Sequence, residues 1–207
     1  MNIKLAFATA GFLLIATQVQ AESLVDGSAE AGKAKSLTCT ACHGPEGNSS
    51  TAMWPNIAGQ NAPYLRTQLK AFKDGSRKDP LMTAQAMMLS EQDMADLAVY
   101  FESLPAAAQA VGNPGSVDRG EALYRGGNSA NGTAACLACH GPSGRGNPAA
   151  KYPALQGQHA DYTAKQLTDY AAGTRETDGK TRIMRDIAAT LSKEDIAALS
   201  SYVQGLR

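Results

Sequence analysis

Cys39-Thr40-Ala41-Cys42-His43 and Cys136-Leu137-Ala138-Cys139-His140 are two copies of one pattern, Cys-x-x-Cys-His, and they contain all four cysteines of the 207-residue chain. In this pattern two thiols can add to the vinyl groups of a haem, and the histidine that follows can bind its iron. The sequence therefore predicts two covalently attached haem c groups. We expect the covalent links at Cys39, Cys42, Cys136 and Cys139, and axial iron ligands at His43 and His140.

Three other uses of paired cysteines compete with haem attachment. A thioredoxin-like redox motif needs one copy, no histidine and a βαβ context, which the glycine-rich flanks do not suggest. A structural zinc site spaces its ligands more widely than a histidine placed directly after a cysteine. A disulfide within each motif would close a very small loop and would stabilise little. The duplicated pattern favours haem.

The chain begins with the features of a signal peptide. Lys4 precedes an apolar run over residues 5–16, and Ala21 ends a segment with small residues at a typical cleavage site. The run is short for a membrane span, so a retained N-terminal anchor is the less favoured alternative. We expect residues 1–21 to be cleaved and the mature protein to be exported to the periplasm. Haem attachment of this kind takes place outside the bacterial cytoplasm, which agrees with export.

The two motifs belong to a tandem duplication. They lie 97 residues apart, and residues 64–69 match residues 162–167 at an offset of 98. Near the end of each copy the offset becomes 102, where a Leu-Ser pair precedes the last helix. Prolines and glycines between the copies indicate a linker. We expect a signal peptide at 1–21, an N-terminal haem-binding domain at 22–104, a linker at 105–115 and a C-terminal haem-binding domain at 116–207.

The fold class predicted from the sequence is all-α. No stretch shows the sustained period-two alternation that indicates a sheet. The first helix of each half opens with a serine suited to cap it, and the last opens with a capping box. The predicted helices cover residues 28–38, 62–73 and a segment from Ser90, and then residues 116–124, 160–171 and a segment from Ser192.

The second axial ligand decides whether each haem iron carries electrons or binds a substrate. After the second motif the only methionine is Met184, seven residues before the Leu-Ser pair, and the same position in the first half is Met82. The repeat therefore selects Met82 and Met184 as axial iron ligands, with Met87 and Met88 as alternatives in the first half. His/Met ligation leaves no open position, so the sequence predicts one-electron transfer and no catalytic residues.

Five further side chains are secondary candidates. Arg77 and Arg175 could pair with haem propionates or could be solvated surface residues. Trp54 and Tyr152 could pack near the haem edges, although ordinary core burial explains them as well. His159 corresponds to Asn61 in the repeat, so we interpret it as a partly buried polar residue and not as a ligand.

Charge is balanced over the whole chain and uneven between its halves. The formal net charge is zero, which argues against nucleic acid as a partner. Residues 22–110 contain seven Lys/Arg and ten Asp/Glu, whereas residues 111–207 contain eleven and nine. Such asymmetry could orient a carrier between donor and acceptor, and a chance distribution explains a difference of this size equally well.

The chain resembles the soluble dihaem cytochromes c of the cytochrome c4 type. The likeness covers essentially the whole mature chain and is looser around Met82. It rests on the tandem Cys-x-x-Cys-His units, on Pro153-Ala154-Leu155-Gln156-Gly157-Gln158-His159, on residues 162–169, on Ile183-Met184-Arg185 and on residues 198–206.

This resemblance implies two class I cytochrome c domains, each wrapped around one haem. It further implies an approximate two-fold axis and haem propionates that face each other across the domain interface. The expected function is that of a periplasmic electron carrier. Its expected partners are redox proteins: a membrane quinol-oxidising complex or another donor, and a terminal oxidase or reductase as acceptor, with transient docking to membrane complexes.

Two other functions remain as alternatives. The first is a dihaem peroxidase-like enzyme, in which one iron keeps an exchangeable position; a methionine at the same repeat position in both halves argues against it. The second is an electron-accepting cytochrome subunit of a dehydrogenase complex, which a fixed stoichiometric partner would reveal.

Overall fold

Helices make up almost all the regular structure of the computed structural model, which describes residues 24–207. The N-terminal domain contains α1 (Ala29–Lys35), α2 (Leu37–His43), α3 (Ala62–Lys73), α4 (Pro80–Met87) and α5 (Glu91–Glu102). The C-terminal domain contains η1 (Pro114–Ser116), α6 (Val117–Gly126), α7 (Leu137–His140), α8 (Ala160–Ala171), η2 (Gly179–Thr181), α9 (Ile183–Ala189) and α10 (Lys193–Gly205).

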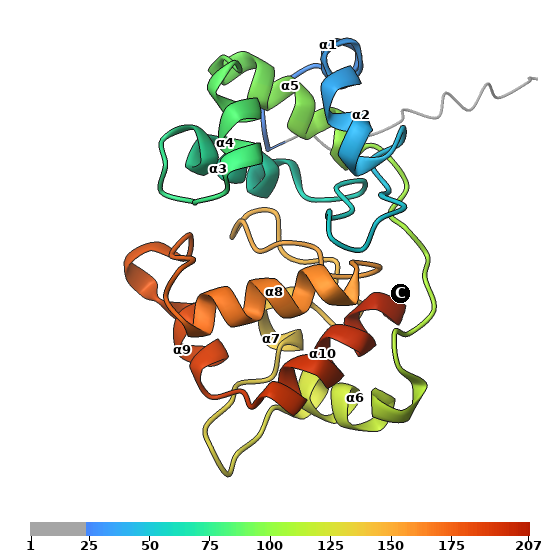
Figure 1. Cartoon of the computed structure of the whole chain (residues 1–207), viewed down its shortest axis with the longest axis vertical. Helices are drawn as coiled ribbons and strands as arrows, with labels where there is room; N and C mark the ends of the chain where they lie inside the picture. Colours follow the sequence, from blue (N-terminus) through green and yellow to red (C-terminus); the bar gives the residue numbers. More distant parts are fainter. Residues whose placement is uncertain (1–23) are drawn as a thin grey trace, which may run out of the picture.

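The two domains are stacked, and the chain between α5 and η1 runs along one side of the molecule (Figure 1). No helix within residues 24–207 combines the length and the apolar character needed to cross a membrane. The predicted signal peptide, residues 1–21, lies outside the described residues.

Much of the predicted secondary structure is confirmed. The middle helices α3 and α8 cover the predicted residues, and capping boxes open α5 and α10 at Ser90 and Ser192. The predicted serine cap of α6 is wrong: Ser116 makes no side-chain cap, because the chain enters this domain through η1, which Asn113 caps instead. The helix predicted over residues 28–38 is two helices, and the second continues through the first haem motif.

Glycine allows the first and last helices of each domain to cross closely. A β-carbon on Gly32 of α1 would lie 2.1 Å from the backbone oxygen of Asp96 in α5. One on Gly120 of α6 would lie 2.4 Å from the backbone oxygen of Ala198 in α10. Because only glycine lacks this atom, the same contact is available to both domains. This crossing brings Tyr124 of α6 and Tyr202 of α10 to a ring-centroid distance of 5.5 Å in the core.

We expect Gly120→Ala to lower the free energy of unfolding by about 1–3 kcal/mol, because the added methyl group would overlap the backbone of α10. Gly126→Ala is the matched control, since it lies in the same helix with open space around its α-carbon. Denaturant unfolding of the haem-loaded protein measures both. Equal stabilities of the two variants would contradict close packing at Gly120.

Polar side chains join the two domains in reciprocal pairs. The backbone N–H of Asn56 donates to Gln158 Oε1 at 3.0 Å, and Gln158 Nε2 donates back to the Asn56 carbonyl at 2.8 Å. Gln60 accepts from the Ala154 N–H at 2.7 Å and donates to its carbonyl at 2.9 Å. The loops that follow the two haem motifs are therefore held together by hydrogen bonds that are largely shielded from water.

Two buried arginines continue this pattern between α3 and α8. Arg77 donates to Tyr162 Oη and to Gln166 Oε1 of the other domain, both at 2.9 Å. Arg175 donates to Tyr64 Oη at 2.8 Å and to Gln68 Oε1 at 3.1 Å. Each arginine thus contacts the tyrosine and the glutamine of the opposite domain, which is the arrangement expected of an approximate two-fold axis.

Tyr64→Phe should destabilise the protein by about 1–3 kcal/mol, because it removes one acceptor from the buried guanidinium of Arg175 and preserves the ring. Tyr100→Phe is a suitable control, since no hydrogen bond of the Tyr100 hydroxyl is found among residues 24–207. In a double-mutant cycle with Arg175→Gln, measured by denaturant unfolding, the two losses should be less than additive. Fully additive losses would show that the bond is not energetically coupled.

Candidate functional site

The four cysteines lie on the two helices that carry the motifs. Cys39 and Cys42 are on α2, while Cys136 caps α7 and Cys139 lies within it. All four are free thiols of intermediate exposure. Burial raises the pKa of Cys39, and it raises the pKa of Cys136 to about 11. These two thiols therefore keep their protons at neutral pH, and addition of S–H across a vinyl group uses that proton.

The two histidines are held by the same hydrogen bond. His43 Nδ1 lies 2.8 Å from the carbonyl oxygen of Pro55, and His140 Nδ1 lies 2.9 Å from that of Pro153. Since a carbonyl oxygen only accepts, Nδ1 carries the proton and Nε2 keeps its lone pair. Burial lowers the pKa of both imidazoles, so they are neutral at pH 7. Each histidine is prepared to bind a metal ion through Nε2.

The residues next to each histidine fix its place. A glycine ends each motif helix with a positive φ, 81° at Gly44 and 77° at Gly141, which directs the chain away from the histidine. The centroids of the Tyr152 and His140 rings lie 6.3 Å apart. Trp54, its counterpart in the repeat, is partly buried in the loop after the first motif.

Exposure divides the methionines of the N-terminal domain into three classes. Met94 is fully buried in α5 and packs in the core, whereas Met53, which also has no methionine counterpart in the repeat, is 72% exposed. Met87 and Met88 are 62% and 85% exposed. Met82 is partly buried near the start of α4, and Met184 is partly buried near the start of α9. The two methionines selected by the repeat thus occupy equivalent places in the fold.

The buried arginines provide a test of whether the site suits a haem. Arg77 is 8% exposed and Arg175 is 5% exposed, so the alternative of a solvated surface arginine is wrong. Their polar partners within residues 24–207 are the neutral side chains of Gln68, Tyr64, Gln166, Tyr162 and Thr177. Buried cations are normally neutralised by an anion. A haem requires thiols for its covalent links, a neutral imidazole for its iron and cations for its two propionates. The described residues provide free thiol pairs, neutral imidazoles and guanidiniums that have no anionic partner among them.

His159 is a buried polar residue, whereas the repeat predicted a partly buried one. It is 7% exposed, and its Nε2 lies 3.0 Å from the backbone oxygen of Ser49 in the other domain. The Ser49 hydroxyl donates to the Cys42 carbonyl at 2.9 Å, so His159 supports the first motif from across the interface. Sequence reasoning missed the interface residues Tyr64, Gln68 and their counterparts, although they stand in the matched runs of the repeat.

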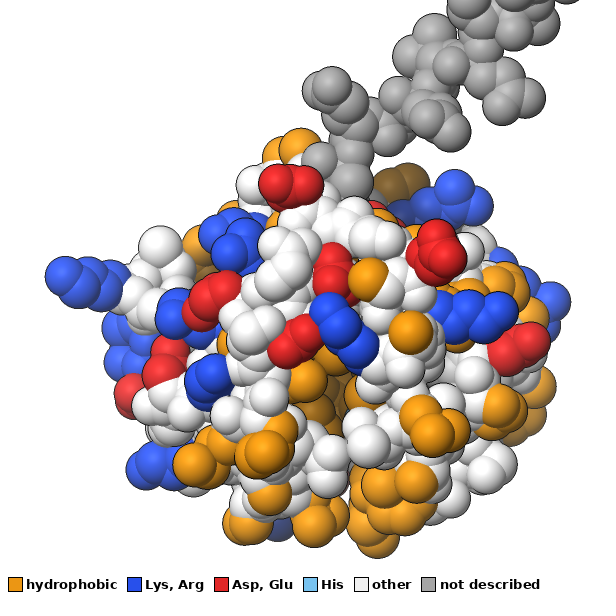
Figure 2. All heavy atoms as spheres, turned by 90° about the horizontal axis from the view of Figure 1, so that it is seen from above, with side chains coloured by type: hydrophobic (Ala, Val, Ile, Leu, Met, Phe, Trp, Pro, Cys, Tyr) orange, Lys and Arg blue, Asp and Glu red, His pale blue; other side chains and the backbone are white. Residues whose placement is uncertain are grey.

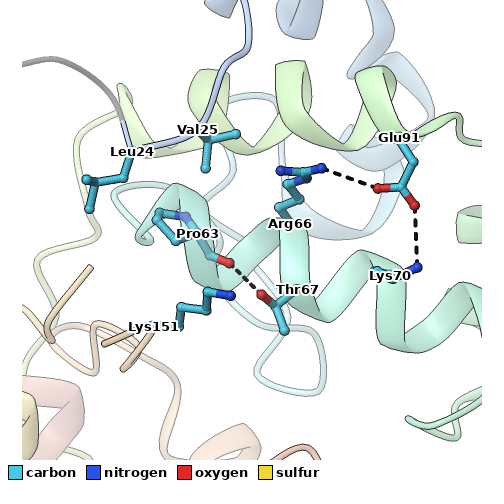
Figure 3. Close-up of a pocket in the computed structure, with 8 residues that line it drawn as sticks. All are labelled: Leu24, Val25, Pro63, Arg66, Thr67, Lys70, Glu91 and Lys151. Carbon is cyan, nitrogen blue, oxygen red and sulfur yellow. Dashed lines mark hydrogen bonds and ion pairs between the residues drawn. The ribbon is translucent and has the colours of Figure 1, made fainter. Parts of the chain in front are cut away.

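One surface cavity of the described residues lies apart from the haem motifs. It has a volume of about 580 Å³ and is lined by Leu24, Val25, Pro63, Arg66, Thr67, Lys70, Glu91 and Lys151 (Figure 3). Glu91 forms ion pairs with Arg66 at 3.4 Å and with Lys70 at 3.5 Å on its rim. None of these residues belongs to a Cys-x-x-Cys-His motif.

The structure also bears on the competing uses of the cysteines. The two motifs lie in different domains, and among residues 24–207 no three His, Cys, Asp or Glu side chains gather as a zinc site requires. Within residues 24–207, β-pairing consists of the isolated bridges Asn128–Thr133 and Asn147–Tyr152. A thioredoxin-like redox motif instead needs a βαβ context.

Comparisons with known proteins agree on the family. The cytochrome c family model matches the chain twice, over residues 29–105 and 117–207. Cytochrome c4 of Pseudomonas aeruginosa is 52% identical over 180 residues, which cover 87% of this chain and 89% of that protein. The crystal structure of reduced recombinant cytochrome c4 from Pseudomonas stutzeri is 48% identical, with a TM-score of 0.86, and the match covers 88% of this chain and 100% of that one.

A more distant relative is the thiosulfate dehydrogenase electron acceptor of Stutzerimonas stutzeri. It is 34% identical over 169 residues, which cover 80% of this chain and 77% of that protein. The predicted fold of two tandem class I cytochrome c domains and the prediction of two covalently bound haem c groups are confirmed. The chain belongs to the cytochrome c4 family of dihaem electron carriers.

Proposed function

We propose that each domain holds its haem through the residues that the repeat selects. Cys39 and Cys42 in the first domain, and Cys136 and Cys139 in the second, form the covalent links. His43 and His140 would each supply one iron ligand, and Met82 and Met184 would each supply the other. The Nδ1 bonds to Pro55 and Pro153 support the histidine assignment, because they leave Nε2 free to coordinate.

The observation that carries the functional proposal is the equivalence of Met82 and Met184. Both are partly buried near the start of matching short helices, while Met87 and Met88 point into solvent. Bound haem supplies one-electron redox chemistry, and a thioether ligand on both irons would leave no position for substrate. The chain's own part is to hold the imidazoles neutral and to keep water from the metal. This arrangement supports a carrier and argues against a dihaem peroxidase.

Met184→Ala should leave the haem attached, because both thioether links remain. It should lower the reduction potential of the C-terminal centre, because the soft sulfur ligand that favours the reduced state is lost. A spectroscopic redox titration measures haem content, ligation and both potentials together. Met87→Ala is the control and should leave the spectrum unchanged. If the spectral features of the axial ligands were unaltered in Met184→Ala, Met184 would not be the iron ligand of the C-terminal domain.

The cellular role that fits these features is electron delivery in the periplasm. We assign residues 1–21 to a cleaved signal peptide, 22–104 and 116–207 to the two haem domains, and 105–115 to the linker. The carrier would accept single electrons from a membrane quinol-oxidising complex or another donor and would pass them to a terminal oxidase or reductase. A covalently bound haem supports this role, because attachment of this kind takes place after export.

Oxidation by respiratory membranes tests the terminal-oxidase route. Respiratory membranes from the bacterium to which the protein is native should oxidise the reduced holoprotein with consumption of oxygen. Cyanide should block this reaction. Met184→Ala, in which the C-terminal haem centre is altered, is compared with the wild-type protein in the same oxidation assay. Oxidation that cyanide leaves unaffected would rule out a haem-copper oxidase as the acceptor.

A second candidate is the electron-accepting subunit of a dehydrogenase. The similarity to the thiosulfate dehydrogenase electron acceptor favours it, as does a 29% identical match, with a TM-score of 0.77, to 40% of a thiosulfate dehydrogenase chain from Marichromatium purpuratum. Purification from the native periplasm separates the two functions. A dehydrogenase present in fixed stoichiometry would establish the subunit, whereas a lone dihaem protein would support the free carrier.

A further inference from the structure

Large hydrophobic side chains are exposed mainly on the N-terminal domain. Five of them belong to α2, to the loop after the first motif and to α4, and we call this set the uncharged face: Leu37, Met53, Leu81, Met87 and Met88. Their exposures range from 62% for Met87 to 85% for Met88. Large hydrophobic side chains scattered singly are ordinary, but several from neighbouring elements indicate a contact surface.

Helix α4 contributes the largest share of the uncharged face. Leu81, Ala84, Gln85 and Met88 recur at the spacing of one helical stripe, and all four are exposed. The opposite side of α4 packs against α3 and buries Ala86 completely. The exposed stripe thus has no partner among residues 24–207. Figure 2 shows hydrophobic side chains on both sides of a hollow at one edge of this domain, with most charged side chains away from it.

Charged residues are missing from the segments that form this face. The stretches 36–45, 47–65 and 80–90 contain no Asp, Glu, Lys or Arg. The C-terminal domain provides an internal comparison, since the repeat places Lys151 opposite Met53 and Asp186 opposite Ala84. There Arg182 and Asp186 form an exposed ion pair at 3.2 Å on α9. The two domains share their haem-holding residues but present different chemistry around them.

We propose that the N-terminal domain docks a redox protein through the uncharged face, and that the contact surface of this partner is itself apolar and uncharged. The proposal rests on the electron-carrier function. Charged groups on a partner would lose water against this face without gaining an opposite charge, which disfavours them. Methionine side chains are flexible and polarizable, so they suit a contact that forms and separates repeatedly.

The position of the uncharged face also fits electron transfer. Leu37 begins α2 two residues before Cys39, and Leu81 precedes Met82 on α4. The face therefore lies on the two elements that carry the proposed haem links and the proposed methionine ligand of the first domain. A partner seated on it would be close to the first haem, which shortens the path that an electron must cross.

Substitutions at the last residue of α4 test the docking surface. Met87→Glu and Met87→Lys place either charge on the uncharged face, and Ala189→Glu and Ala189→Lys place it at the equivalent last residue of α9. The probe is oxidation of reduced holoprotein by respiratory membranes of the producing bacterium, at about 20 and about 200 mM KCl. Oxidation by a small cobalt complex reports intrinsic reactivity, and spectra with potentials show that each variant is intact.

Both Met87 variants should raise KM for the membranes about tenfold, equivalent to about 1.4 kcal/mol, and should leave the cobalt reaction unchanged. Both Ala189 variants should stay within about twofold of the wild-type KM, and wild-type KM should change little with salt. Opposite effects of Glu and Lys at position 87 would indicate a charged partner and would overturn the proposal, as would Met87 variants that behave like the wild type.

The same experiment separates this proposal from the respiratory role. If the membranes oxidise the wild-type protein and the Met87 variants equally well, the carrier function stands and the docking surface is wrong. If the membranes do not oxidise the wild-type protein at all, the respiratory role fails and the docking surface fails with it.

Discussion

Two buried guanidiniums, Arg77 and Arg175, set the relation between the domains. Each follows its own domain's middle helix in the chain and donates to a tyrosine and a glutamine of the other domain. Each also stacks on a ring of its own domain, with Arg77 Cζ 4.5 Å from the Phe72 centroid and Arg175 Cζ 4.6 Å from that of Tyr170. Although burial acts to raise it, the two cations lower the pKa of Tyr64, because their positive charge at the interface favours the ionised hydroxyl.

That positive interface links folding to the cofactor. Burying a cation among neutral partners is costly unless an anion lies nearby. The propionates of bound haem would supply such anions beside the two arginines. Each apolar core is also small, with buried clusters around Tyr124 and Leu199 in one domain and around Leu97 and Phe101 in the other. Domains of this size generally need a further source of stability, which a buried haem provides.

The duplication preserved the chemistry of the site and changed its surroundings. The motif cysteines, the histidine–proline carbonyl bond and the partly buried methionine recur in both domains. The surfaces near them do not recur, since the first domain carries exposed methionines and leucines where the second carries Lys151 and an Arg182–Asp186 pair. The two haem-holding sites are therefore equivalent, while the surfaces around them differ.

The sequence by itself determined the haem motifs, the duplication, the middle helices and the capping boxes, because each depends on neighbouring residues or on a fixed offset. It did not show α4 and α9, because short helices have too few residues for a clear periodic pattern. Only the tertiary structure decided that Arg77 and Arg175 are buried and that His159 supports the other domain's motif, since their partners in the other domain are 85 to 111 residues away. Contacts over such separations depend on how the two domains pack, and no local pattern in the chain records that packing.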